Sequence, residues 1–216
     1  MPDLSFEVIS AEVAAYSVLP LLNFKMRISN ASEEEQIQNI NLKSQIMLAV
    51  TQRRYTAEEK ARLFELFGEP ERWGTTLRAF LWTHVTTVVP RFSGSTIVDL
   101  PVPCSYDFEV VSTKYFNALE DGEIPLNFLF SGTIFYEGQA GNVQIGQISW
   151  SKEANYRLPV ALWKAAIEAA FPNSAWIRMP KDVFDQLYRY KITRGLITWE
   201  AVLTRLLQAS GEEVQV

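Results

Sequence analysis

The chain has 216 residues, of which 48% are apolar, 20 are basic and 25 are acidic, so it is long and apolar enough to fold around a sizeable core. The net charge is −5, and the charged residues do not form long blocks of one sign, which argues against nonspecific electrostatic binding to nucleic acid or anionic lipid. One cysteine and one histidine exclude a disulfide framework, a Cys-rich zinc site, an HExxH motif and an intramolecular CxxC redox pair.

The N-terminal residues are acidic where a signal peptide would need a basic stretch followed by an apolar run, so we expect no export signal. The most apolar windows, residues 80–89 and 126–135, are too short to cross a bilayer, which needs about 20 apolar residues. We therefore expect a cytoplasmic protein without membrane insertion, in which Cys104 stays reduced.

The first half of the chain alternates apolar and polar residues, which is the pattern of half-buried antiparallel strands. We expect a short strand at residues 4–8 and longer strands at residues 22–28 and 40–50, with a turn at residues 30–35. The two longer strands are predicted to pair as a hairpin, so that the chain opens as a β-meander.

A helix is predicted after these strands, because Thr56 and Glu59 have the spacing of a capping box and Gly68 stands where a left-handed C-cap is expected. It is an inserted helix, since residues 77–89 return to alternation. That stretch has large apolar side chains at both parities, which predicts a central strand covered on both faces.

Pro101 and Pro103 cannot donate hydrogen bonds to a sheet, so their strand is predicted at an edge or broken by a bulge near Cys104, with the pattern continuing to residue 110. A short helix is expected at residues 112–121. Residues 124–136 and 143–150 have the pattern of a second hairpin.

From Pro159 onward the apolar spacing becomes helical and predicts three short helices, with Thr198 as a cap for the last. The predicted fold class is α+β: an antiparallel β-sandwich or curled sheet with an inserted helix and a C-terminal group of three short helices. We expect a single domain over residues 1–210, with a β-rich body at 1–151 and a docked helical tail at 152–210.

His84 is the one side chain whose ordinary pKa lies near neutrality, and we expect it to be hydrogen-bonded beneath the helical layer. The alternative pairs it with Cys104 as base and nucleophile. Cys104 lies in a predicted strand, however, and not at a helix N-terminus that would lower a thiol pKa. We therefore assign no catalytic residue.

Acidic side chains at loop ends could converge on a hard cation, but no EF-hand spacing is present, and a solvated rim explains them with fewer assumptions. Neither GxGxxG nor a P-loop occurs, so we assign no metal and no cofactor. The acidic residues in question are Asp99, Asp107, Glu109, Glu120, Asp121 and Glu123.

Basic residues in the tail interleave with aromatic ones, a combination that can grip nucleic acid. Asp182, Asp185 and Glu200 dilute this charge, and an amphipathic helix explains the pattern more simply, so we expect no nucleic-acid partner. The basic residues are Arg178, Lys181, Arg189, Lys191 and Arg194, and the aromatic ones are Trp176, Tyr188 and Tyr190.

Aromatic residues make up 12% of the chain and include six tryptophans, most of which should pack between sheet and helices. Exposed Trp and Tyr dominate interface hot spots, so a protein-binding surface is expected near residues 70–73 or along the tail helices. The candidate interaction or pocket residues are Trp73, Trp82, His84, Cys104, Trp176, Tyr188 and Trp199.

Residues 67–74, 81–85, 99–104 and 130–133 resemble an uncharacterised bacterial family, a domain of unknown function, and the resemblance covers nearly the whole chain. The family is associated with gene neighbourhoods of nickel–iron uptake hydrogenases, so the resemblance implies an accessory or assembly role beside a metalloenzyme. It carries no known catalytic residues. The alternation of the first strands is also similar to the sheet of SecB-type export chaperones.

The leading hypothesis is a non-catalytic accessory protein that binds another polypeptide, with a hydrogenase-related subunit as the partner implied by the resemblance and a homo-oligomer left open. The second is an enzyme that uses carboxylates, with or without a metal, which would gather acidic residues beside His84 in a cleft. The third is a carrier of a small apolar ligand, in a cavity lined by Trp82, Phe128 or Phe130, or a SecB-like chaperone.

Overall fold

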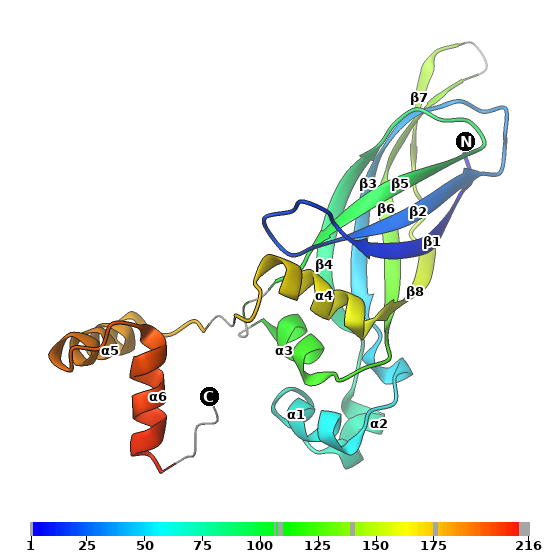
Figure 1. Cartoon of the computed structure of the whole chain (residues 1–216). Helices are drawn as coiled ribbons and strands as arrows, with labels where there is room; N and C mark the ends of the chain where they lie inside the picture. Colours follow the sequence, from blue (N-terminus) through cyan, green and yellow to red (C-terminus); the bar gives the residue numbers. More distant parts are fainter. Residues whose placement is uncertain (1, 106, 108–109, 139–140, 175–176, 212–216) are drawn as a thin grey trace. The chain divides into compact units, whose positions relative to one another are not determined.

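The computed structural model describes residues 2–105, 107, 110–138, 141–174 and 177–211 (Figure 1). The chain forms two compact units, Met1–Trp176 and Ile177–Val216. The first unit combines antiparallel sheets with short helices and the second contains helices, so the predicted α+β class is confirmed.

Two antiparallel sheets form the body of the first unit. The smaller has the strand order β1–β2–β5 and consists of β1 (Leu4–Val13), β2 (Leu21–Asn30) and β5 (Ser95–Pro103). The larger sheet consists of β3 (Ile37–Leu48), β4 (Phe80–Val89), β6 (Glu123–Glu137), β7 (Val143–Gln147) and β8 (Glu153–Pro159). Its strand order is β4–β3–β6–β7, and β8 pairs with the first half of β6, before the part that pairs with β7.

Helices lie between the strands and after them. Those of the first unit are α1 (Ala57–Phe67), α2 (Trp73–Thr76), α3 (Val111–Ala118) and α4 (Val160–Ala170), with 3-10 turns η1 (Val50–Gln52) and η2 (Pro70–Arg72). The second unit contains α5 (Lys181–Thr193) and α6 (Trp199–Ala209). No helix of the described residues is long and apolar enough to cross a membrane.

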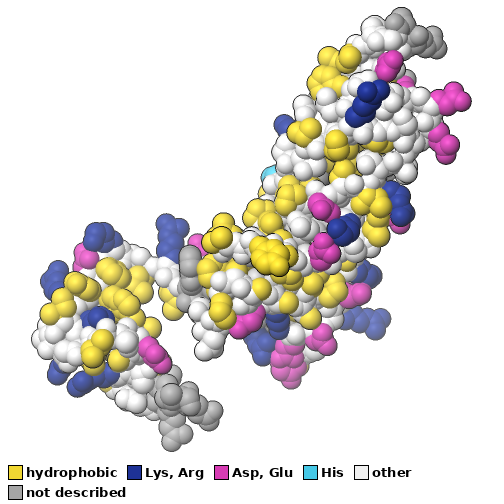
Figure 2. Space-filling model, turned by 45° about the horizontal axis from the view of Figure 1, so that its top comes forward, with side chains coloured by type: hydrophobic (Ala, Val, Ile, Leu, Met, Phe, Trp, Pro, Cys, Tyr) yellow, Lys and Arg dark blue, Asp and Glu magenta, His cyan; other side chains and the backbone are white. Residues whose placement is uncertain are grey.

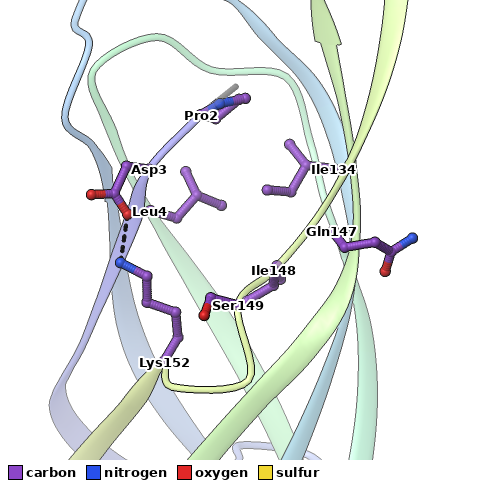
Figure 3. A pocket seen from close by; sticks show the side chains of 8 residues that line it. All are labelled: Pro2, Asp3, Leu4, Ile134, Gln147, Ile148, Ser149 and Lys152. Atoms are coloured by element: carbon purple, nitrogen blue, oxygen red, sulfur yellow. Dashed lines mark hydrogen bonds and ion pairs between the residues drawn. The ribbon is translucent and has the colours of Figure 1, made fainter.

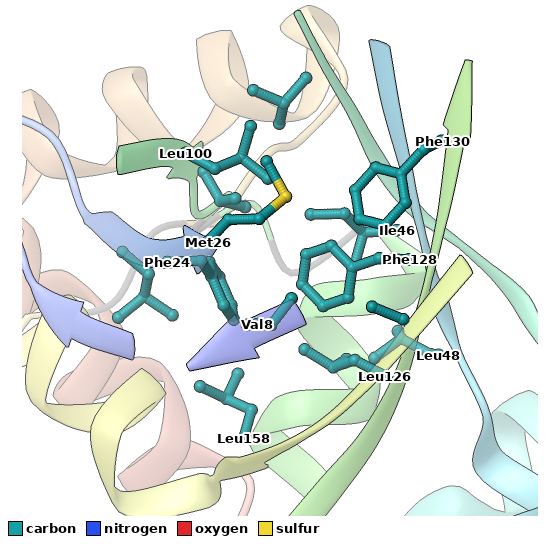
Figure 4. Packing of buried hydrophobic residues seen from close by; sticks show 14 of the residues in the cluster. Val8, Phe24, Met26, Ile46, Leu48, Leu100, Leu126, Phe128, Phe130 and Leu158 are labelled. Atoms are coloured by element: carbon teal, nitrogen blue, oxygen red, sulfur yellow. The ribbon is translucent and has the colours of Figure 1, made fainter. Parts of the chain in front are cut away.

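The core of the first unit lies between its two sheets (Figure 4). Alternation along each strand turns every second side chain inward, so Phe24 of the smaller sheet meets Phe128 of the larger, with ring centroids 5.3 Å apart. Phe6 of the smaller sheet and Phe130 of the larger also meet, with their rings stacked at 4.3 Å. This interlocking of inner faces makes the two sheets one packed body.

The predicted pairing of the first long strands is wrong. β2 pairs with β1 and β5, whereas β3 pairs with β4 and β6 in the other sheet. Alternation reports which face of a strand is buried and carries no information on the neighbouring strand. The second hairpin, β6 with β7, and the edge position of the proline-containing β5 are confirmed.

The prediction of a central strand at residues 77–89 is also wrong, because β4 is an edge strand that pairs with β3 alone. The ladder pairs Leu81 with Met47 and Thr83 with Ile46, so Trp82 is an extra residue in a β-bulge. The bulge changes the parity of the inward side chains. Trp82 and Val85, which have opposite parity, therefore both face one core, whereas Val88 is exposed. The pattern does not indicate two covered faces.

Local signals from the sequence are confirmed in α1 and in the C-terminal helices. Thr56 and Glu59 form the capping box of α1, each accepting a hydrogen bond from the other's amide, and Gly68 caps its end at φ 67°. Thr198 caps α6 by accepting from the Ala201 amide at 3.1 Å. The three C-terminal helices are present as α4, α5 and α6.

The predicted boundary between body and tail at residue 152 differs from the division in the structure. β8 was not expected from the sequence and pairs with β6, and α4 buries Val160 and Trp163 in the core of the first unit. Both elements therefore belong to the body. The docking of α5 and α6 stays a prediction.

Candidate interaction surface on the C-terminal helices

Trp73 is buried in the first unit. Its indole Nε1 donates a hydrogen bond to the Gly68 carbonyl at 3.0 Å, and its ring meets those of Tyr55 and Phe67, each at 5.5 Å. These contacts fasten the segment after α1 to the core. The segment at residues 70–73 therefore does not present this indole to a partner.

Trp82 is half-buried and packs edge-on against Phe116 at 5.0 Å and Phe24 at 6.3 Å. The bulge in β4 turns its ring toward the core, where such edge-to-face pairs stabilise packing. Trp82 therefore packs against the core from the edge strand β4.

His84 is exposed, so the expectation of a histidine beneath a helical layer is wrong. It follows the bulge on β4 and lies opposite Gln45 of β3, on the outer side of the larger sheet. Its neighbour along the strand, Val85, takes the inward position.

Cys104 is 6% exposed, and its thiol donates to the Val102 carbonyl at 3.8 Å. Burial raises the pKa of this thiol to about 12, so it is protonated at neutral pH. A buried, protonated thiol lacks the activation that a cysteine nucleophile needs.

Several of the acidic residues that could have converged pair with different cations instead. Asp99 pairs with Lys25 at 3.2 Å, and Glu120 pairs with Arg62 at 2.9 Å. Glu109 lies outside the described residues. Within the described part of the chain, no three His, Cys, Asp or Glu side chains are grouped as metal ligands would be.

A shallow pocket of about 180 Å³ lies where the start of β1 meets the junction of β6, β7 and β8 (Figure 3). It is smaller than the pockets of roughly 300–1,000 Å³ that hold drug-sized ligands. Lys152 closes one side through an ion pair with Asp3 at 2.6 Å. Trp82, Phe128 and Phe130, the predicted cavity lining, are not among its walls.

Packing within the second unit leaves many of its apolar side chains uncovered. α5 buries none of its residues, and α6 buries only Val202. Both helices carry wide apolar faces, and packing them on each other covers one side of each. Figure 2 shows apolar side chains gathered on the visible face of this unit, with Lys and Arg among and around them.

Phe184, Tyr188 and Trp199 form an aromatic cluster on this surface. The ring centroids of Phe184 and Trp199 are 5.3 Å apart, and Tyr188 lies 6.2 Å from Phe184 and 6.3 Å from Trp199. The three side chains are 40%, 49% and 37% exposed. They are thus held in place by one another while a face of each remains open.

The structure brings together two of the seven candidate residues, Tyr188 and Trp199. Trp176 lies outside the described residues. Phe184 was part of the predicted helical stripe but was not singled out, although its spacing of four residues from Tyr188 places both on one helix face. The loop between the helices brings the third ring to them.

None of the curated proteins compared matches the chain. Among solved structures, a protein described as late embryogenesis abundant (LEA) is similar at 14% identity and a TM-score of 0.35, over 74% of this chain and 73% of that one. A Bordetella pertussis protein described as ApaA has 11% identity and a TM-score of 0.26, over 73% and 93%.

The β-glucosidase 3B of Thermotoga neapolitana is similar at 13% identity and a TM-score of 0.25, over 72% of this chain and 17% of that enzyme. Scores this low do not establish a shared function. A family model described as a family of unknown function, DUF6084, matches residues 1–215.

Proposed function

The chain belongs to the family of unknown function DUF6084, and on that premise we propose that it is a non-catalytic accessory protein whose C-terminal helices bind another polypeptide. The observation that carries the proposal is the half-exposed cluster of Phe184, Tyr188 and Trp199. Trp and Tyr are enriched in interface hot spots, where a partner covers rings that are already held in place.

Other exposed apolar residues of the second unit support the same function. Large contiguous apolar patches are uncommon on soluble monomers and mark interaction sites. A unit of two short helices has too little interior to enclose two apolar faces, so a bound polypeptide would supply the missing layer. The exposed residues are Ile177, Val183, Ile192, Ile197, Leu203 and Leu207.

The finer proposal is that this polypeptide takes part in the assembly or maturation of a hydrogenase-type metalloenzyme in the bacterial cytoplasm. Its support is the resemblance at residues 67–74, 81–85, 99–104 and 130–133 to a family found beside uptake hydrogenases. Gene neighbourhood is an association, so this part of the proposal is tested separately.

Site-specific photo-crosslinking in the native host tests the proposal. The photoreactive residue p-benzoylphenylalanine replaces Trp199 in the full chain, and a matched control replaces Gln208, which is exposed on the other side of α6 by helical spacing. We expect a crosslinked polypeptide from position 199 that is missing from position 208. Equal or no crosslinking at the two positions contradicts the proposal, and a partner unrelated to hydrogenases contradicts only its finer part.

A further inference from the structure

A lysine lies beside the aromatic cluster, and the second unit is less acidic than the rest of the chain. The unit Ile177–Val216 contains six Lys or Arg and five Asp or Glu, a net charge of +1, against a net charge of −5 for the whole chain. Asp185 is paired with Lys181 at 3.0 Å. Asp182 and Glu200 lie in first helical turns, where the amides of the helix end stabilise negative charge.

Two of the cations lie against aromatic rings of this unit. Lys191 Nζ is 5.9 Å from the centroid of Trp199, and the Arg194 guanidinium is 5.7 Å from that of Tyr190. Neither forms an ion pair among the described residues. Each cation makes a cation–π contact with a ring on one side, and its other sides remain available to carboxylates.

We infer that the polypeptide bound here is an acidic amphipathic α-helix, an inference that rests on the proposed function. Its apolar face covers Phe184, Tyr188 and Trp199, and its carboxylates pair with Lys191 and Arg194. α5 and α6 are 13 and 11 residues long, so a partner helix of about three turns matches their length at roughly 1.5 Å per residue.

Charge and architecture favour this occupant over the alternatives. An extended strand needs a free sheet edge, and the described residues of this unit form helices. Joining two copies through this face would bring like charges together, which opposes association. A second copy remains an outcome of the test.

Peptide binding to the full-length protein tests the inference. The probes are two fluorescent amphipathic helical peptides of about 18 residues with the same apolar face, one flanked by Glu and the other by Lys. Fluorescence anisotropy at low salt should give a dissociation constant at least about tenfold lower for the Glu peptide. The preference should shrink as salt is added, because screening weakens exposed charge pairs.

Charge reversal identifies the residues responsible. The double variant K191E/R194E should reverse the preference toward the Lys peptide. The control Arg189→Glu makes the same kind of charge change at an exposed position on the opposite side of α5, and it should keep the preference for the Glu peptide. Trp199→Ala should weaken binding of the Glu peptide at least about tenfold.

Equal binding of the two peptides, a preference of the unaltered protein for the Lys peptide, or binding of neither would overturn the inference. Self-association that is lost in Trp199→Ala would overturn it in favour of a second copy. None of these results decides the crosslinking experiment, so the proposed function can survive the loss of this inference.

Discussion

Arg53 and Glu59 form an ion pair that is nearly closed to solvent, with side chains 8% and 2% exposed and an Nη2 to Oε1 distance of 2.6 Å. Arg53 also donates to the carbonyls of Asp121 and Glu123, each at 2.6 Å. Glu59 accepts from the amides of Thr56 and Glu120. The pair thus ties the start of α1 to the chain between α3 and β6.

Arg53→Met should lower the free energy of unfolding by about 3–5 kcal/mol, because it leaves the Glu59 carboxylate buried without its cation. Arg62→Met is the matched control, since Arg62 pairs with Glu120 while its side chain is 52% exposed, and it should cost less than about 1 kcal/mol. Urea unfolding followed by circular dichroism measures both. Similar losses in the two variants would contradict this account.

Glu59 also makes stability depend on pH. Burial alone would raise the pKa of Glu59, but hydrogen bonds from the Glu120 and Thr56 amides and the contact with Arg53 outweigh it and lower the pKa below its ordinary 4.5. The unfolded chain therefore binds this proton more readily than the folded one. The stabilisation is present above the ordinary pKa and is lost as pH falls through the lowered folded value.

Urea unfolding from about pH 6 down to about pH 3 should therefore show a steeper loss of stability in the unaltered protein than in Glu59→Gln. The variant should be less stable at neutral pH, and the difference between the two proteins should narrow in acid. Parallel curves across this range would contradict the assignment.

Cys104 should resist thiol reagents in the folded protein, because it is buried and its pKa is raised to about 12. Iodoacetamide at about pH 8 should label the native protein at least tenfold more slowly than the urea-unfolded protein. Mass spectrometry counts the labelled fraction. Rapid labelling of the native protein would show that the thiol is accessible.

Elements whose signals are local could be predicted from the sequence, and their partners in the fold could not. The α1 capping box lies within a few adjacent residues, so the sequence pattern includes every residue that forms it. The pairing of β2 with β5 joins segments far apart in the sequence, and alternation is the same whichever strand is the neighbour. The bulge at Trp82 could not be predicted either, so the apolar residues of β4 were interpreted as two buried faces when the strand has one.

The candidate site was predictable to the same extent. Helical spacing placed Tyr188 and Trp199 on apolar stripes, and their convergence follows from the short connection between α5 and α6. The burial of Trp73 and the exposure of His84 depend on what lies across from them in space. Residue type alone therefore could not predict that Trp73 is buried and His84 is exposed.

Gly132 shows the close approach of β6 to β3. At φ 142°, a Cβ at this position would collide with the backbone carbonyl oxygen of Asn41. Gly132→Ala should therefore lower the free energy of unfolding by about 2–4 kcal/mol, because neither backbone can move without disturbing the ladder.

Gly74→Ala is the control for this prediction, because a Cβ at Gly74 in α2 meets nothing within 4 Å. It should leave stability unchanged or raise it by up to about 1 kcal/mol. Chemical denaturation of both variants gives the comparison. A neutral Gly132→Ala would show that the strands can separate locally at little cost.

At the scale of the whole molecule, the first unit contains a complete core. The residues of its hydrophobic cluster run from Leu4 to Ile167, and none comes from α5 or α6. A chain ending at residue 176 should therefore unfold cooperatively, with a free energy within about 0.5 kcal/mol of the full-length value. A loss of more than about 1 kcal/mol would instead support the predicted docking of the tail helices on the body.

The strand pairing also sets an order on folding. The β1–β2 hairpin is synthesised first, but β2 also pairs with β5, which is synthesised much later. Likewise, β3 cannot complete its pairing before β6 is made, because Ile37 of β3 pairs with Tyr136 of β6. Such distant pairings slow folding to milliseconds or longer. During synthesis, the apolar faces of β2 and β3 are available to aggregate or to engage a chaperone until residue 137 has emerged.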